Sequence, residues 1–357
     1  MQQPWHLRAT TRRKRRRPGI GLVGGLLVVL CSLAGAAPPP VEVGLGFGAT
    51  SLQPLVELMT GGEASLTPEQ ARDRPGFARN TRGDNSRGFT TDPLWARFHL
   101  RAASGIPQLV LLEIAYPLLD QVSLTLFYPD GRRQTFEAGD DHEFDVRPLH
   151  FANPTFPVDL PAEGIVTGVL RLQTTGSLQF PLILRPASAQ SEYVSGRFLS
   201  FGVYYGVFLS LAFLACGIFV YARDASFLLY ALYLVSYAVL QFSLNGFGHQ
   251  FLWSGPGQMA SRVPIVLIGT TMLCMMWLTI RFLGFWPHSR ALRLAFRVFL
   301  VLAAAVGMLG AFAPLAVAIP LASLVGSCLL PLILAAGVFS MRLGSRTARY
   351  FIVAWGL

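Results

Sequence analysis

Beyond residue 197 the sequence consists mainly of apolar runs that are long enough to cross a lipid bilayer. A membrane-spanning helix needs about 20 predominantly apolar residues, and such runs follow one another with short breaks. Asp224 is the only acidic residue in this part. The sequence therefore predicts an all-α, multi-span membrane helix bundle over residues 198–357. Five complete spans and the start of a sixth are predicted: Phe198–Tyr221, Ser226–Leu244, Val263–Gly284, Leu294–Ala313, Leu315–Met341 and a helix starting at Tyr350.

The predicted sixth span stops after eight residues, at Leu357. A membrane helix that ends there leaves backbone groups and an apolar end without partners. We therefore expect that the protein continues beyond this sequence.

Composition and charge support a membrane protein and exclude several other classes. The chain is 52% hydrophobic and 13% charged, which is too apolar for a soluble globular protein. The net charge of +10 reflects seven basic residues within positions 1–17 and nine arginines within 198–357, so no nucleic-acid partner is predicted. Lys14 is the only lysine, which excludes lysine-dependent phosphate loops and Schiff-base chemistry from the mature chain.

Residues 1–36 predict a signal peptide. The basic run Arg12–Arg17 precedes the apolar run Ile20–Leu33, and small residues end at Ala36, where cleavage is expected. An uncleaved anchor helix is the alternative. Twin-arginine export fits less well, because apolar residues do not follow Arg12 and Arg13 directly.

Residues 37–192 predict an all-β domain that is long enough to form a β-sandwich with its own core. Leu94–Arg101 and Ile165–Gln173 alternate with period two, and the turn Tyr128–Gly131 separates two strands of a predicted hairpin. The segment contains no cysteine, so a disulfide framework and a thiolate metal site are excluded there.

Arginine positions predict the orientation of the spans. Eight arginines flank the loops after spans one, three and five, whereas the opposite loops contain Arg262 alone. Because basic loops stay in the cytoplasm, we expect the β-domain outside the cytoplasm and a multi-pass protein of the cell membrane.

The order of motifs resembles a known family, the bacterial seven-transmembrane receptors with diverse intracellular signalling modules, including their second type of extracellular domain. The resemblance implies a jelly-roll sensor akin to carbohydrate-binding folds, seven helices and a cytoplasmic output such as a diguanylate cyclase or a histidine kinase. It also implies location in the bacterial inner membrane, and homodimers are consistent with it. The motifs are Leu94–Phe98, Glu113–Asp120, Gly139–Asp140, Arg147–Pro148, Asn153–Pro157, Thr175–Pro181, Tyr221–Asp224, Leu229–Tyr233, Ser243–Gly248, Trp253 and Ala348–Trp355.

One strand face has the chemistry of a glycan site. The alternation places Trp95, Arg97, His99 and Arg101 on one face, opposite Leu94, Ala96, Phe98 and Leu100. An indole ring stacks on sugars and guanidinium groups bind hydroxyls or anions, so this face is the first candidate for a small-molecule or glycan ligand. The alternative is a solvated face on which Trp95 packs under a loop.

Other polar residues are secondary candidates for ligand contact. They are Arg147, Tyr116 and Asp120, although the last two also fit a turn that ends a strand. The acidic loop Gly139–Asp145 could bind calcium, but its spacing fits a solvated loop better, and no metal or cofactor is predicted. His249 fits either a polar helix cap or a contact with the sensor domain.

These observations predict a non-enzymatic receptor chain that senses an extracytoplasmic ligand and relays its presence inward. The rival hypothesis is an envelope transporter or a membrane-bound glycan-handling enzyme. Against it, no acid follows Asp224 to bind a coupling ion, and no nucleophile motif is present.

Overall fold

The computed structural model describes residues 39–356, except Leu45, residues 62–65, Arg82, residues 256–258 and residues 284–288. The predicted signal peptide, residues 1–36, lies outside the described residues.

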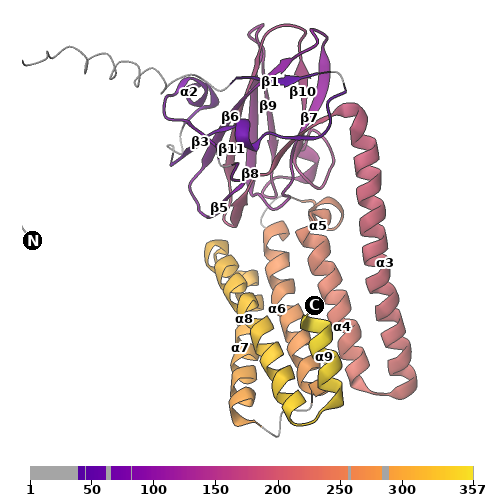
Figure 1. Cartoon of the computed structure of the whole chain (residues 1–357). Helices are drawn as coiled ribbons and strands as arrows, with labels where there is room; N and C mark the ends of the chain where they lie inside the picture. Colours follow the sequence, from indigo (N-terminus) through magenta and orange to yellow (C-terminus); the bar gives the residue numbers. More distant parts are fainter. Residues whose placement is uncertain are drawn as a thin grey trace, which may run out of the picture. The chain divides into compact units, whose positions relative to one another are not determined.

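The N-terminal part is a β-sandwich whose two main sheets are almost entirely antiparallel (Figure 1). In the larger sheet the order is β4-β3-β6-β11-β8-β9, and β1 pairs in parallel with β6; in the second sheet it is β10-β7-β13-β2, and β12 pairs with β5. The strands are β1 (Val41–Val43), β2 (Thr50–Ser51), β3 (Glu57–Thr60), β4 (Ala78–Arg79), β5 (Ser86–Phe89), β6 (Leu94–Ala102), β7 (Gln108–Ile114), β8 (Gln121–Phe127), β9 (Arg133–Ala138), β10 (Thr155–Leu160), β11 (Val166–Gln173), β12 (Ser177–Gln179) and β13 (Leu182–Pro186).

The main core lies between the two sheets. Alternate residues of β6, Leu94, Ala96, Phe98 and Leu100, are all fully or almost fully buried in it. Opposite them the second sheet contributes the alternating apolar residues of β7, β10 and β13. The predicted phase of β6 is therefore confirmed on its inner face.

The other face of β6 is covered at Trp95, which the alternation alone did not predict. Helix α2 (Pro68–Asp73) begins at Thr67 with a capping box and packs over the larger sheet. Its Ala71 joins Trp95 and Val169 in a second, smaller apolar cluster. Trp95 is only 1% exposed, so this face belongs partly to the core.

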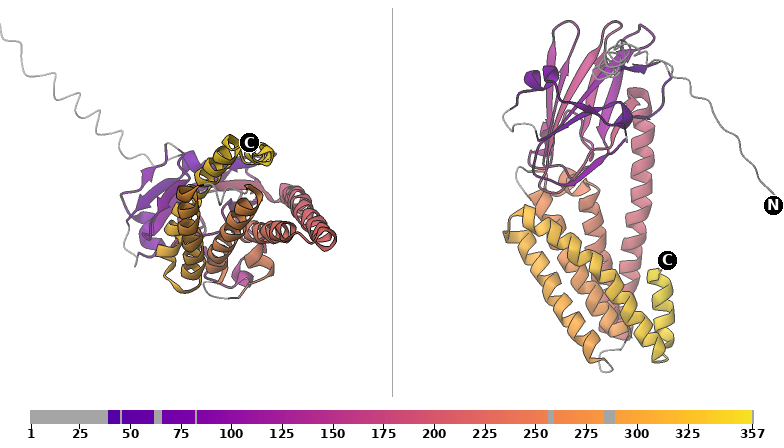
Figure 2. Two further views of the ribbon diagram at one scale, coloured as in Figure 1. Left: turned by 90° about the horizontal axis from the view of Figure 1, so that it is seen from below. Right: turned by 60° about the vertical axis from the view of Figure 1, so that its left-hand side comes forward.

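The C-terminal part is helical, and five of its helices are long and apolar enough to span a membrane (Figures 1 and 2). Two shorter helices, α5 and α9, accompany them. The helices are α3 (Gln190–Ala222), α4 (Ala225–Leu244), α5 (Phe247–Phe251), α6 (Met259–Leu283), α7 (Arg290–Phe312), α8 (Leu315–Arg342) and α9 (Arg346–Gly356).

Helix α6 packs against α4, α7 and α8, whereas α3 packs against α4 at the side of the bundle (Figure 2). The contact between α6 and α7 is close because it uses small residues: a Cβ atom on Gly269 would lie 2.6 Å from the backbone nitrogen of Gly307. Arg262 of α6 donates to the carbonyl oxygens of Gly310, Ala311 and Ala313 at 2.9–3.3 Å. It thereby satisfies carbonyl groups that the end of α7 leaves without helical partners.

Candidate functional site at the junction of sandwich and helices

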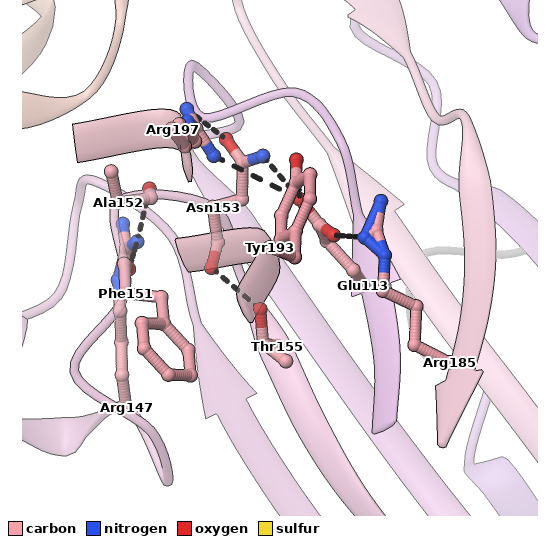
Figure 3. A network of polar contacts seen from close by, with 9 residues as sticks. All are labelled: Glu113, Arg147, Phe151, Ala152, Asn153, Thr155, Arg185, Tyr193 and Arg197. Atoms are coloured by element: carbon pink, nitrogen blue, oxygen red, sulfur yellow. Dashed lines mark hydrogen bonds and ion pairs between the residues drawn. The ribbon is translucent and has the colours of Figure 1, made fainter. Parts of the chain in front are cut away.

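A buried carboxylate links the sandwich to the first membrane helix (Figure 3). Glu113 of β7 is 2% exposed. It forms an ion pair with Arg185 of the neighbouring strand β13 at 3.1 Å and accepts a hydrogen bond from the Asn153 side chain at 2.6 Å. β7 and β13 are adjacent antiparallel strands in which Glu113 pairs with Ile183. Arg185, two residues further on, therefore lies on the same face of the sheet.

Helix α3 supplies the other partners of this carboxylate. The Tyr193 hydroxyl donates to Glu113 at 3.4 Å, and Arg197 lies 3.9 Å from the same carboxylate. These two residues are four apart, so both face the sandwich from one side of the helix. The Arg185 guanidinium also stacks over the Tyr193 ring at 3.6 Å. A displacement of β7 or β13 relative to α3 must therefore break charged contacts in a buried site.

Arg147 holds the loop beside this network. It is 2% exposed and donates to the carbonyl oxygens of Phe151 and Ala152, at 3.1 and 2.8 Å (Figure 3). Burial lowers the pKa of Arg147 to about 10, so the group still carries its charge at neutral pH. Asn153, the residue after Ala152, donates from its side-chain amide to Glu113, and its amide oxygen lies 3.5 Å from the Arg197 guanidinium. Arg147 thus positions one arm of the Glu113 network.

The loop region around α5 also contacts the sandwich. The His249 ring packs edge-on against Phe144, with ring centroids 5.5 Å apart, and the Ser254 carbonyl accepts from the Phe144 backbone N–H at 3.0 Å. Burial and the nearby Arg147 lower the pKa of His249 to about 4, so His249 is neutral at physiological pH. Of the two sequence hypotheses for His249, this geometry favours contact with the sensor domain.

Gly246 makes the closest approach in this contact. It has a φ of +81°, and a Cβ atom there would lie 2.6 Å from the Cβ of Pro117 and 3.0 Å from the Ala152 carbonyl oxygen. Residues with side chains adopt this left-handed conformation at a cost. Both the turn and the packing therefore require glycine.

A cavity of about 200 Å³ lies beside the junction, between the base of the sandwich and helices α4, α6 and α8. Tyr116, Asp120 and Asp140 line it from the sandwich and Ser261 from α6. Asp120 accepts from the Thr174 hydroxyl at 3.1 Å and from the Thr175 hydroxyl and backbone N–H at 2.7 Å each.

Asp140 is the least satisfied of the lining residues. One oxygen accepts from the Ser261 hydroxyl at 3.1 Å, whereas the other has no hydrogen-bond partner among the described residues. Burial, followed by the charge of Asp120, raises the pKa of Asp140 well above its ordinary value. Burial also raises the pKa of Tyr116, to about 12. The prediction that the loop Gly139–Asp145 is solvated is thus wrong for Asp140, which is 2% exposed.

The first set of predicted ligand residues is placed differently from what we expected. The indole of Trp95 is buried under α2 and has no free face for a sugar. Arg97 forms an ion pair with Glu57 at 2.7 Å, donates to the Arg72 carbonyl and stacks over Phe77. The burial of Trp95 favours the second alternative, in which this residue packs under another segment, although that segment is helix α2 and not a loop.

The remaining predicted residues fall into three places. The His99 ring contacts the Thr167 hydroxyl at 3.0 Å, while Arg101 is exposed near the end of β6. Tyr116 and Asp120 come together in the junction cavity, and Arg147 lies in the loop beside Glu113. Their ligand roles stay predictions.

Sequence reasoning missed Glu113 as a candidate, and it considered Asp140 only as one carboxylate of the acidic loop Gly139–Asp145. Glu113 is a lone acid in the otherwise apolar segment Leu109–Ile114, and a charge in a buried strand requires a buried partner, which was the available signal. In the described part of the chain, no group of three His, Cys, Asp or Glu side chains could hold a metal ion.

The comparisons with known proteins agree with this architecture. Residues 53–185 match the family model described as 7TMR-DISM extracellular 2, and residues 197–357 match the model described as 7TM diverse intracellular signalling. None of the curated proteins compared with the chain gives a match. The sandwich and the helices are thus the extracellular and membrane domains of a multi-pass membrane protein of the 7TMR-DISM receptor family, the family that the sequence motifs predicted.

Proposed function

We propose that this chain is the sensing and membrane part of a bacterial inner-membrane receptor, and that the Glu113 network carries its signal. In this proposal a ligand on the extracytoplasmic sandwich changes the position of β7 and β13 relative to α3. The helices then pass the change to an output module on the cytoplasmic side. The observation that supports this proposal is that one buried carboxylate, that of Glu113, has partners in both parts of the chain. Its partners are Arg185 and Asn153 of the sandwich and Tyr193 and Arg197 of α3.

The physical requirement is a ligand that binds two states of the receptor with different affinities. A buried charged network favours discrete arrangements, because a partly broken ion pair leaves a desolvated charge without compensation. Such a network can therefore separate two states of the receptor.

Spin-label distance measurements test this proposal. The four native cysteines are replaced by serine, and the labels are attached through Ser226→Cys and Ser345→Cys. These positions report on the ends of α4 and α8 that we assign to the cytoplasm. Glu113→Gln should shift the distance distribution between these labels, and Asp130→Asn, in an exposed hairpin ion pair with Arg132, should not. Identical distributions in the parent and Glu113→Gln chains would contradict the proposal.

A glycan ligand remains the chemical class that the family resemblance favours. With Trp95 buried, its stacking platform would have to come from other residues. No observation on the described residues favours the transporter or the enzyme hypothesis over the receptor proposal.

A further inference from the structure

The junction cavity combines an apolar wall with an acidic end. Helices α4, α6 and α8 contribute apolar side chains, including Leu244, Ile265 and Ile319, and the sandwich contributes Phe89 and Tyr116. The charged residues that line it are Asp120 and Asp140, and no basic side chain of the described residues lines it. A molecule that fills this space therefore meets hydrocarbon on most sides and negative charge at one end.

The two carboxylates have different capacities to bind a ligand. Asp120 already accepts three hydrogen bonds from Thr174 and Thr175, which fix its position. Asp140 has one committed oxygen, on Ser261, and one free oxygen, although it is almost completely buried. A buried acceptor without a partner is unfavourable, so a donor placed there by a ligand would recover stability.

The backbone fixes Asp140 in this position. Gly139 precedes it with a φ of +127°, and a Cβ atom at Gly139 would lie 2.1 Å from the Asp120 carbonyl oxygen. The Asp140 N–H donates to the Leu119 carbonyl at 2.9 Å. The free oxygen is thus held by the packed backbone of the β8–β9 edge, and the site is built into the fold.

We infer that this cavity binds a small organic cation, an ammonium group on an apolar body, with Asp140 as the acceptor and Tyr116 and Ile265 among the groups around the apolar part. The ammonium supplies a hydrogen-bond donor to the unpartnered oxygen of Asp140 and adds positive charge to that of the nearby Arg147. The apolar body matches the helical walls. Burial raises the pKa of Asp140, so binding of the cation is coupled to release of the Asp140 proton, and the bound ammonium then stabilises the carboxylate that forms.

The cavity touches both the sandwich and three membrane helices, so its occupant would hold them in one arrangement. This inference deepens the proposed function. It rests on the proposed function only for the claim that binding changes the signal, because binding to the cavity itself can be measured without any signalling readout. The ligand class that it names, an amphiphilic amine, differs from the glycan expected from the sequence.

The test uses the full chain in lipid nanodiscs with benzylamine as the probe, and benzyl alcohol as the uncharged probe of the same shape. Calorimetry at pH 7 should detect benzylamine binding, with at least tenfold weaker binding of benzyl alcohol. Asp140→Asn should weaken benzylamine binding tenfold or more, and Ile265→Trp should block it by filling the cavity. Asp130→Asn, remote from the cavity, should leave the affinity unchanged.

Three outcomes would overturn the inference. They are an absence of benzylamine binding up to about 10 mM, corresponding to less than roughly 3 kcal/mol, equal binding of benzyl alcohol, and unchanged affinity in Asp140→Asn. Failure here leaves the spin-label test at Ser226 and Ser345 unaffected, because that test perturbs Glu113 and uses no ligand. The two proposals can therefore fail separately.

Discussion

Removal of the Glu113 carboxylate should strongly destabilise the protein. In Glu113→Ala, the guanidinium of Arg185, with 8% of its side chain exposed, would stay buried without its anion. The side chain of Asn153 and the hydroxyl of Tyr193 would lose an acceptor in the same step. Breaking a buried ion pair by removing one partner typically costs about 3–5 kcal/mol, and we expect a loss in that range.

Two matched variants separate the charge from the packing. Glu113→Gln keeps the shape and one acceptor oxygen for Asn153, so the loss should fall to about 1.5–3 kcal/mol, the value of a charge-assisted hydrogen bond. Asp130→Ala removes an exposed carboxylate, whose partner Arg132 has a side chain that is 62% exposed, and should change the stability far less.

The assay is reversible denaturant unfolding of the full chain in nanodiscs, followed by circular dichroism and tryptophan fluorescence. A loss of less than about 1 kcal/mol for Glu113→Ala, which is the range of exposed ion pairs, would refute the reasoning. So would equal losses for Glu113→Ala and Asp130→Ala. Either result would show that the network contributes no more than a surface pair.

Three further predictions concern the core, the bundle and the buried acid. Trp95→Ala and Phe98→Ala should each cost about 3–5 kcal/mol in denaturant unfolding, because both side chains are at most 1% exposed; a neutral Trp95→Ala would contradict the second apolar cluster. Gly269→Leu should lower the thermal unfolding midpoint by forcing α6 and α7 apart, while Gly217→Leu, where a Cβ meets nothing within 4 Å, should not. Because the pKa of Asp140 is raised by burial, the folded state keeps a proton that the unfolded state has lost above about pH 4. Stability should therefore fall as pH rises above about 4, and Asp140→Asn should reduce this slope; an unchanged slope would show that Asp140 is not buried in solution.

The sequence was sufficient to predict the features that depend on local periodicity. Alternation in Leu94–Arg101 gave the correct inner face of β6, and the apolar runs predicted five helices close to their observed bounds. Motif order also predicted the receptor family. The structure places the start of the first helix at Gln190 rather than Phe198, because the polar turns before the span continue the same helix.

Features that depend on distant segments could not be predicted in this way. Trp95 is buried by α2, which lies more than 20 residues earlier and has only six residues, too few to show a helical stripe. Asp140 lies in an acidic loop whose composition indicates solvent, yet it is buried, with Ser261 of the distant helix α6 beside it. The partners of Glu113 come from β13, from the loop at Asn153 and from α3, so no local window contains the site.

The most direct test of the central claim is a double-mutant cycle between Glu113 and Arg197, one residue of the sandwich and one of the first membrane helix. Stabilities of the parent chain, Glu113→Gln, Arg197→Gln and the double variant would be measured by denaturant unfolding in nanodiscs. If the two parts share one charged network, the two losses should be non-additive, with an interaction energy of about 0.5–3 kcal/mol. Additive losses would contradict the claim that this junction couples the sandwich to the membrane helices.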